Sequence, residues 1–169
     1  MSACDILVIA NLNMDLILEQ KNSQQTSRKR YADSFTLSPG GNGYNEAVAA
    51  ARMGATVALA GMIGSDSFGA QLKASLNEEI TDSQLVRVVP GSSGLSLILS
   101  SAGQENIYWD IVGANACLDE EYIRGLEAHI AKVKLLVVGF GVPYASTVLA
   151  IRLAQKHGTA VMLVAYQSR

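Results

Sequence analysis

The feature that most restricts how this 169-residue chain can fold is an alternation of short apolar runs with segments of helical periodicity. The apolar runs are rich in Val, Ile and Leu, which is typical of strands covered on both faces of a parallel sheet. They lie at residues 5–10, 56–60, 135–138 and 160–164. Helices are predicted at residues 47–52, 66–79, 119–132 and 145–156. This order predicts an α/β fold with a doubly wound, Rossmann-like, mostly parallel sheet.

Four further segments look like strands that have no helices between them. They lie at residues 14–20, 30–37, 95–101 and 105–110. Ala102-Gly103-Gln104 joins the last two as a predicted hairpin. We therefore expect a small antiparallel β lid attached to the parallel sheet, where it can close over a ligand.

Composition favours one ordinary globular domain and excludes two classes of partner. The chain is 49% hydrophobic and 17% charged, which suits one domain over residues 1–169. A formal net charge of -2 means that the chain lacks the excess of basic residues that binds nucleic acid or anionic lipid. No apolar run approaches the ~20 residues that cross a bilayer. Without a recognisable secretory leader, Cys4 and Cys117 are expected to be buried reduced thiols in a cytoplasmic protein.

The turn Gly40-Gly41-Asn42-Gly43 leads directly into the Ala-rich predicted helix. Its glycines let the backbone approach a ligand closely, and the first amides of a helix point outward unpaired. The turn therefore fits a small polar ligand, or it serves only to pack the helix on its sheet. A dinucleotide fingerprint is excluded because Glu46 stands where its last glycine belongs, and no Gly-Lys-Ser/Thr of a P-loop occurs.

A second polar motif, Asn11-Leu12-Asn13-Met14-Asp15, follows the first predicted strand. Ligands of open α/β sheets bind beyond the carboxyl ends of strands, and Asn11, Asn13 and Asp15 share one face of an extended chain. The motif is suited to binding hydroxyl groups. Asx turns that end a strand are the alternative interpretation.

Taken together and in order, four motifs resemble the amino-terminal half of the ribokinase (PfkB-type) carbohydrate kinase family. They are Asn-x-Asn-x-Asp at 11–15, the segment from Gly40 to Ala55, Gly61-x-x-Gly64-x-Asp66-x-x-Gly69, and Gly113-Ala114-Asn115-Ala116. The resemblance implies a sugar- or nucleoside-binding half and a lid. It implies six substrate-binding residues and no metal ligand: Asn13, Asp15, Gly40, Gly41, Asn42 and Asn45. Leu97, Leu99 and Trp109 would close over the sugar's apolar edges, unless Trp109 packs within the lid or against a second lid.

The resemblance also implies ATP and Mg²⁺ as cofactors, with binding residues expected outside this chain. The family's Gly-Ala-Gly-Asp turn, which supplies backbone amides and the catalytic aspartate, does not occur here. Phosphoryl transfer depends on such groups, so no catalytic residue is assigned and the chain alone is predicted to be inactive. Four acidic residues examined as substitute bases are interpreted as capping or solvated groups: Asp110, Asp119, Glu120 and Glu121.

Several positions depart from the ribokinase pattern. Asn42 replaces a lysine and Glu46 a glutamine, and Gly139-Phe140-Gly141 occupies the region of a sugar-contacting glutamate. The polar run 21–30 and the end 166–169 also differ. Two hypotheses follow: part of a carbohydrate kinase, or a non-catalytic sugar-binding or regulatory homologue. A homodimer is expected through the lid or through the apolar edge strand 160–164.

Overall fold

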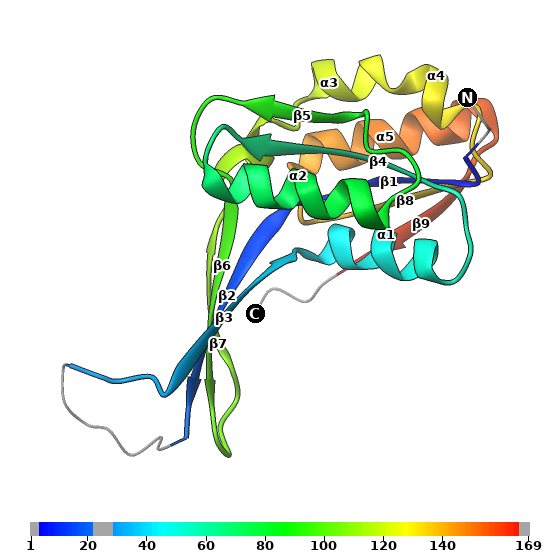
Figure 1. The fold of residues 1–169 in the computed structure, drawn as a ribbon. Helices are drawn as coiled ribbons and strands as arrows, with labels where there is room; N and C mark the ends of the chain where they lie inside the picture. The colour runs from blue at the N-terminus through cyan, green and yellow to red at the C-terminus, as the bar shows by residue number, and fades with distance from the viewer. Residues whose placement is uncertain (1–3, 22–28, 166–169) are drawn as a thin grey trace.

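The computed structural model describes residues 4–21 and 29–165, which form an α/β body and a projecting four-stranded lid (Figure 1). The body sheet has the order β5-β4-β1-β8-β9, and every neighbouring pair is parallel. Its strands are β1 (Ile6–Ile9), β4 (Val57–Gly64), β5 (Val86–Val89), β8 (Leu135–Gly139) and β9 (Ala160–Val164). The predicted mostly parallel sheet is confirmed.

Helices cover both faces of the body sheet because successive side chains of a strand point to opposite faces. Val8 and Ala10 pack in a cluster with α1 (Asn42–Arg52) and α2 (Ser67–Glu79). Leu7 and Ile9 pack in the other cluster. The elements on that face are η1 (Gly113–Cys117), α3 (Glu120–Gly125), α4 (Glu127–Ile130) and α5 (Tyr144–His157). The fold is therefore doubly wound, as predicted.

The lid sheet has the order β3-β2-β6-β7. Its strands are β2 (Asn13–Gln20), β3 (Ser34–Gly40), β6 (Gly94–Ser101) and β7 (Ile107–Ile111). The predicted β6–β7 hairpin is antiparallel, but β2 runs parallel to β6. The expectation of a wholly antiparallel lid was wrong because both of these strands leave the same edge of the body and run outward together (Figure 1).

Most element boundaries agree with prediction, and the main differences are as follows. Strand β4 ends at Gly64 and not at residue 60. Strand β3 begins at Ser34 and continues through Pro39, which an edge strand tolerates because one side of its backbone is unpaired. Helix α1 begins at Asn42, five residues early. The helix predicted over 119–132 is interrupted at Leu126, directly after Gly125, a weak helix former. Strand β5 was not predicted.

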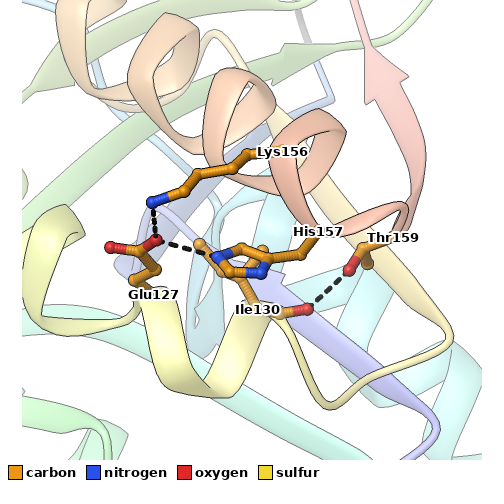
Figure 2. A network of polar contacts seen from close by, with 5 residues as sticks. All are labelled: Glu127, Ile130, Lys156, His157 and Thr159. Atoms are coloured by element: carbon orange, nitrogen blue, oxygen red, sulfur yellow. Dashed lines mark hydrogen bonds and ion pairs between the residues drawn. The ribbon is translucent and has the colours of Figure 1, made fainter.

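Away from the lid, α4 and α5 are joined by a polar cluster (Figure 2). Glu127 Oε1 lies 2.8 Å from both Lys156 Nζ and His157 Nε2. Beside it, the Thr159 hydroxyl donates to the Ile130 carbonyl at 2.8 Å. These contacts connect the two helices.

Neither cysteine forms a disulfide, and Cys117 is exposed, contrary to the expectation that it is buried. Its side chain lies at the end of the short helix η1, away from the apolar positions of the sheet. Among the helices that the structure describes, none is long and apolar enough to span a membrane.

Candidate substrate site

A polar cavity of about 300 Å³ lies between the lid and the start of α1. The turn after β1, strand β2 and the glycine turn supply Asn11, Asn13, Asp15, Gly41, Asn42 and Asn45. Strands β6 and β7 supply Ser96, Ile98, Tyr108 and Asp110. Five of the six predicted substrate-binding residues therefore border one cavity. The sixth, Gly40, lies directly behind Asp15.

The glycine turn is shaped by close backbone approaches. Gly41 caps α1 with φ of 91°, which favours glycine, and a Cβ there would lie 2.6 Å from the Asn11 carbonyl oxygen. A Cβ on Gly40 would lie 2.0 Å from Asp15 Oδ2. The Gly43 amide donates to Asn11 Oδ1 at 3.1 Å. The turn thus packs the helix on its sheet and also borders the cavity.

Asn13 is almost fully buried and takes part in a hydrogen-bond chain behind the cavity. Its Oδ1 accepts from Asn115 Nδ2 at 2.9 Å, and its Nδ2 donates to Ser96 Oγ at 3.1 Å. Asn115 also accepts from the Leu12 amide at 2.8 Å. The Asn-x-Asn-x-Asp motif and the Gly-Ala-Asn-Ala motif therefore meet here, and Asn13 holds the lid to the body as well as bordering the cavity.

Three strands place a polar row across the cavity face of the lid. Asp15 is the register partner of Ser96 in the parallel pair, and Ser96 is the partner of Asp110 in the antiparallel pair. Register partners share a face of the sheet. Ser96 Oγ donates to Asp110 Oδ1 at 2.6 Å. Two carboxylates thus flank one buried hydroxyl.

Asp15 is the least satisfied polar group of the site. Its Oδ1 is buried and has no hydrogen-bond partner among the described residues. Burial raises the pKa of Asp15 and the negative charge of Asp110 raises it further, while the Gly41 amide and Ser96 hydroxyl partly offset both effects. A group that donates a hydrogen bond to Asp15 would relieve this cost.

Asn42 and Asn45 occupy the first turn of α1 and are exposed at the cavity. Their amides provide both donors and acceptors. Neither side chain is charged, because Asn42 stands where the ribokinase pattern has a lysine.

The motif Gly64-x-Asp66-x-x-Gly69 has a structural task. Asp66 caps α2 by accepting from the Gly69 amide at 2.8 Å. It also accepts from the Ser93 amide at 2.9 Å and the Ser93 hydroxyl at 2.7 Å. These bonds fix the residues that lead into β6. Burial raises the pKa of Asp66, but the hydrogen bonds outweigh burial and the pKa lies below its ordinary value.

Asp110 lies within β7 and borders the cavity, so it caps no helix. Its exposure agrees with the prediction of a solvated group, but its place at the cavity was not predicted. Leu97, Leu99 and Trp109 alternate with the cavity residues along β6 and β7, so their side chains lie on the opposite face of the lid. The expectation that they cover the sugar was wrong, because the residues next to them along each strand are the ones that face the cavity. Pairing Ser96 with Asp110 across the predicted hairpin was the available signal.

The predicted replacement of a sugar-contacting glutamate falls beside the cavity. A Cβ on Gly141 would lie 2.5 Å from Asn11 Oδ1, and Phe140 stacks on Tyr144 with ring centroids 6.1 Å apart. This region offers close packing and aromatic surface in place of a carboxylate. The departures at 22–28 and 166–169 lie outside the described residues.

No group of three or more His, Cys, Asp or Glu side chains suited to a metal ion occurs in the described part of the chain.

A doubly wound sheet with a lid over a polar cavity defines a class of small-molecule-binding α/β proteins. The family model for pfkB family carbohydrate kinase matches residues 4–169, and the chain belongs to this family. It is 31% identical to a ribokinase of Haemophilus influenzae over 159 residues, covering 94% of this chain and 52% of the relative. It is also 31% identical to a deoxyribokinase of Salmonella typhi over 160 residues, covering 94% and 52%.

The fold agrees with solved structures of the same kind. A structure of Arabidopsis thaliana ribokinase complexed with ribose and ATP superimposes with a TM-score of 0.80 at 18% identity, covering 95% of this chain and 53% of that one. The chain spans about half the length of the curated relatives it matches.

Proposed function

We propose that this chain forms the acceptor-binding half of an ATP-dependent carbohydrate kinase. In this proposal its cavity holds the hydroxyl groups of a sugar or nucleoside, and residues outside these 169 supply the nucleotide site and the catalytic aspartate. Asn13, Asp15 and Asn45 contact the acceptor, and Gly40, Gly41 and Asn42 form the wall beside it. A cytoplasmic location belongs to the same proposal.

The observation that carries the proposal is the unpartnered Asp15 Oδ1 in a cavity bordered by amides. A carboxylate accepts hydrogen bonds from hydroxyl groups more strongly than a neutral acceptor does. Asn42 and Asn45 add donors and acceptors on the opposite side. This arrangement suits a ligand with several hydroxyls spaced around a ring.

In this proposal the described residues supply the acceptor-binding groups. When bound in a complete kinase, ATP provides the phosphoryl group. The task of this chain is then to orient the acceptor hydroxyl and to exclude water under the lid. We expect no ATP-dependent transfer to ribose, fructose or adenosine by the chain alone in a coupled assay, and turnover abolished by Asp15→Ala would contradict this.

Calorimetric titration with ribose, deoxyribose, fructose, adenosine and inosine tests the binding proposal. We expect weak binding of at least one of these, lost in Asp15→Ala and kept in Glu78→Ala, which removes an exposed carboxylate on α2. Binding that Asp15→Ala leaves unchanged would refute the assignment. Catalysis by the chain alone would favour a complete enzyme, and binding by a protein that never supports transfer would favour the non-catalytic homologue.

The proposal includes self-association through the outer face of the lid. Large apolar side chains are exposed on that face: Phe35, Leu37, Ile107, Trp109 and Ile111. The edge strand β9 is the second candidate because Met162 and Leu163 are exposed there. Light scattering of Trp109→Ser and of Met162→Ser separates the two surfaces. We expect the lid variant to lower the dimer fraction, and a loss only in the β9 variant would assign the edge.

A further inference from the structure

We propose that the cavity selects an acceptor that carries a protonated amine in addition to its hydroxyl groups, bound between Asp15 on β2 and Asp110 on β7. The inference rests on the proposed function of the same site and narrows its substrate class to amino sugars or amine-bearing nucleosides. Asp110 is then a specificity-determining residue of the lid.

The two carboxylates are spaced for a ligand and do not contact each other directly. Asp15 and Asp110 belong to one row across β2, β6 and β7, with Ser96 between them. Neighbouring strands lie about 4.8 Å apart, so the two backbones are separated by about 10 Å. That separation accommodates a small ring whose substituents reach both carboxylates. The Ser96 hydroxyl orients Asp110 through Oδ1.

Among the described residues, no basic side chain borders the cavity to balance the negative charge of its aspartates. Its ten bordering residues include two carboxylates and no Lys, Arg or His. Elsewhere in the described chain, carboxylates near cations form close pairs, as Glu79 does with Arg52 at 2.6 Å. Asp15 Oδ1, by contrast, is buried without a partner. A charge held in this way is costly, and a cationic ligand is the group that offsets it best.

An ammonium group suits both ends of the row. It donates up to three hydrogen bonds and makes charge-assisted bonds to carboxylates, which are stronger than those of a neutral hydroxyl. Asp110 is exposed and so remains accessible to an incoming ligand. Next to it on the same face, Tyr108 borders the cavity beside Ile98, and an aromatic ring also attracts a cation.

The decisive experiment is a calorimetric titration with matched ligand pairs at neutral pH and low salt. D-Fructose is compared with 1-amino-1-deoxy-D-fructose, and D-ribose with 2-amino-2-deoxy-D-ribose. The proteins are the wild-type chain, Asp110→Asn and Glu105→Gln. Glu105→Gln removes the same charge from an exposed position at the hairpin end, outside the cavity.

We expect the wild type to bind at least one amino sugar about tenfold or more tightly than its neutral parent. Asp110→Asn should reduce that preference, taken as the ratio of the two affinities in the same variant, to less than about threefold, and Glu105→Gln should keep it. The amino sugar should also lose affinity as salt is raised, because salt screens exposed charge.

Three results would overturn the inference. Neutral sugars that bind as tightly as their amines would refute it while leaving the proposed function intact, and so would a preference that survives in Asp110→Asn. Titration with Mg²⁺ alone gives the third: binding abolished by Asp110→Asn would show that the carboxylates hold a metal. Failure of every ligand to bind would overturn the proposed function, and this inference with it.

Discussion

The turn before α2 and the cavity beside β2 each contain an aspartate from a sequence motif, in opposite environments. Asp66 accepts three hydrogen bonds, from the Gly69 amide and from the amide and hydroxyl of Ser93. Asp15 has a buried oxygen with no partner among the described residues. The pKa of Asp66 lies below its ordinary value and that of Asp15 lies above it.

This difference separates a carboxylate that holds the fold from one that we propose binds a ligand. The protein stabilises the charge of Asp66 with its own donors, whereas it holds the charge of Asp15 at a cost. Groups kept in such a state tend to mark binding sites, because the cost is recovered when a ligand binds. The comparison can be tested by removing groups of each kind and measuring the free energy of unfolding.

The largest loss is expected at Asn115, the most fully bonded side chain behind the cavity. It bonds to both the amide and the carbonyl of Leu12, to the Val112 carbonyl and to Asn13 Oδ1. Asn115→Ala leaves these buried groups unpaired, so we expect unfolding to become easier by about 3–4 kcal/mol in urea denaturation. The control Asn106→Ala removes an exposed side chain with one long bond of 3.4 Å. Equal losses in the two variants would contradict a framework role for Asn115.

A smaller loss is expected at Asp66. Asp66→Ala removes a helix cap and two bonds to Ser93, and we expect a loss of about 2 kcal/mol. Asp119→Ala is a matched control because Asp119 also caps a helix, through one bond from the Tyr122 amide at 2.8 Å. The Asp66 variant should unfold at lower urea than the Asp119 variant. The reverse order would show that the bonds to Ser93 add nothing.

Sequence alone predicted the body well because its signals are local. Apolar runs and helical periodicity identify strands and helices without knowledge of their partners, as for β8 and α5. The order of the motifs also identified Asp15, Gly41 and Asn45, and the structure places all three at one cavity. The lid was harder because its pairing is set by distant neighbours, and a shift of one position exchanges its two faces. The expected contact of Leu97 and Leu99 with the sugar therefore failed, and the place of Asp110 at the cavity was missed.

The hydrogen-bond environments of Asp15 and Asp66 likewise could not be predicted from the residues next to them in the sequence. Both belong to short motifs that follow predicted strands, and nothing in those motifs states how many donors each carboxylate receives. For Asp66 two of the three donors come from Ser93, which is 27 positions away. Only the folded structure shows which aspartate is satisfied.

Asp15→Asn should change the free energy of unfolding only slightly, and in the direction opposite to the losses expected for Asn115→Ala and Asp66→Ala. Replacing the carboxylate by a neutral amide removes a charge that the folded state disfavours. We expect the free energy of unfolding to stay the same or to rise by no more than about 1 kcal/mol, while acceptor binding is lost. Urea denaturation and calorimetry on one preparation check both parts. A clear loss of stability would show that Asp15 is a framework residue like Asp66.

The smallest expected effect is the pH dependence that distinguishes the two aspartates. The folded-state pKa of Asp66 is lowered, so its contribution to stability is present above the unfolded value of about 3.9 and is lost as pH falls through the folded value. The folded-state pKa of Asp15 is raised, so its unfavourable contribution is relieved as pH falls through that value toward about 3.9. Unfolding of the wild type is compared with Asp66→Asn and with Asp15→Asn between pH 7 and pH 3. On acidification the advantage of the wild type over Asp66→Asn should shrink, whereas any disadvantage against Asp15→Asn should disappear. Differences that move in the same direction for both variants would mean that the two carboxylates share one kind of environment, and the contrast between framework and binding site would fail.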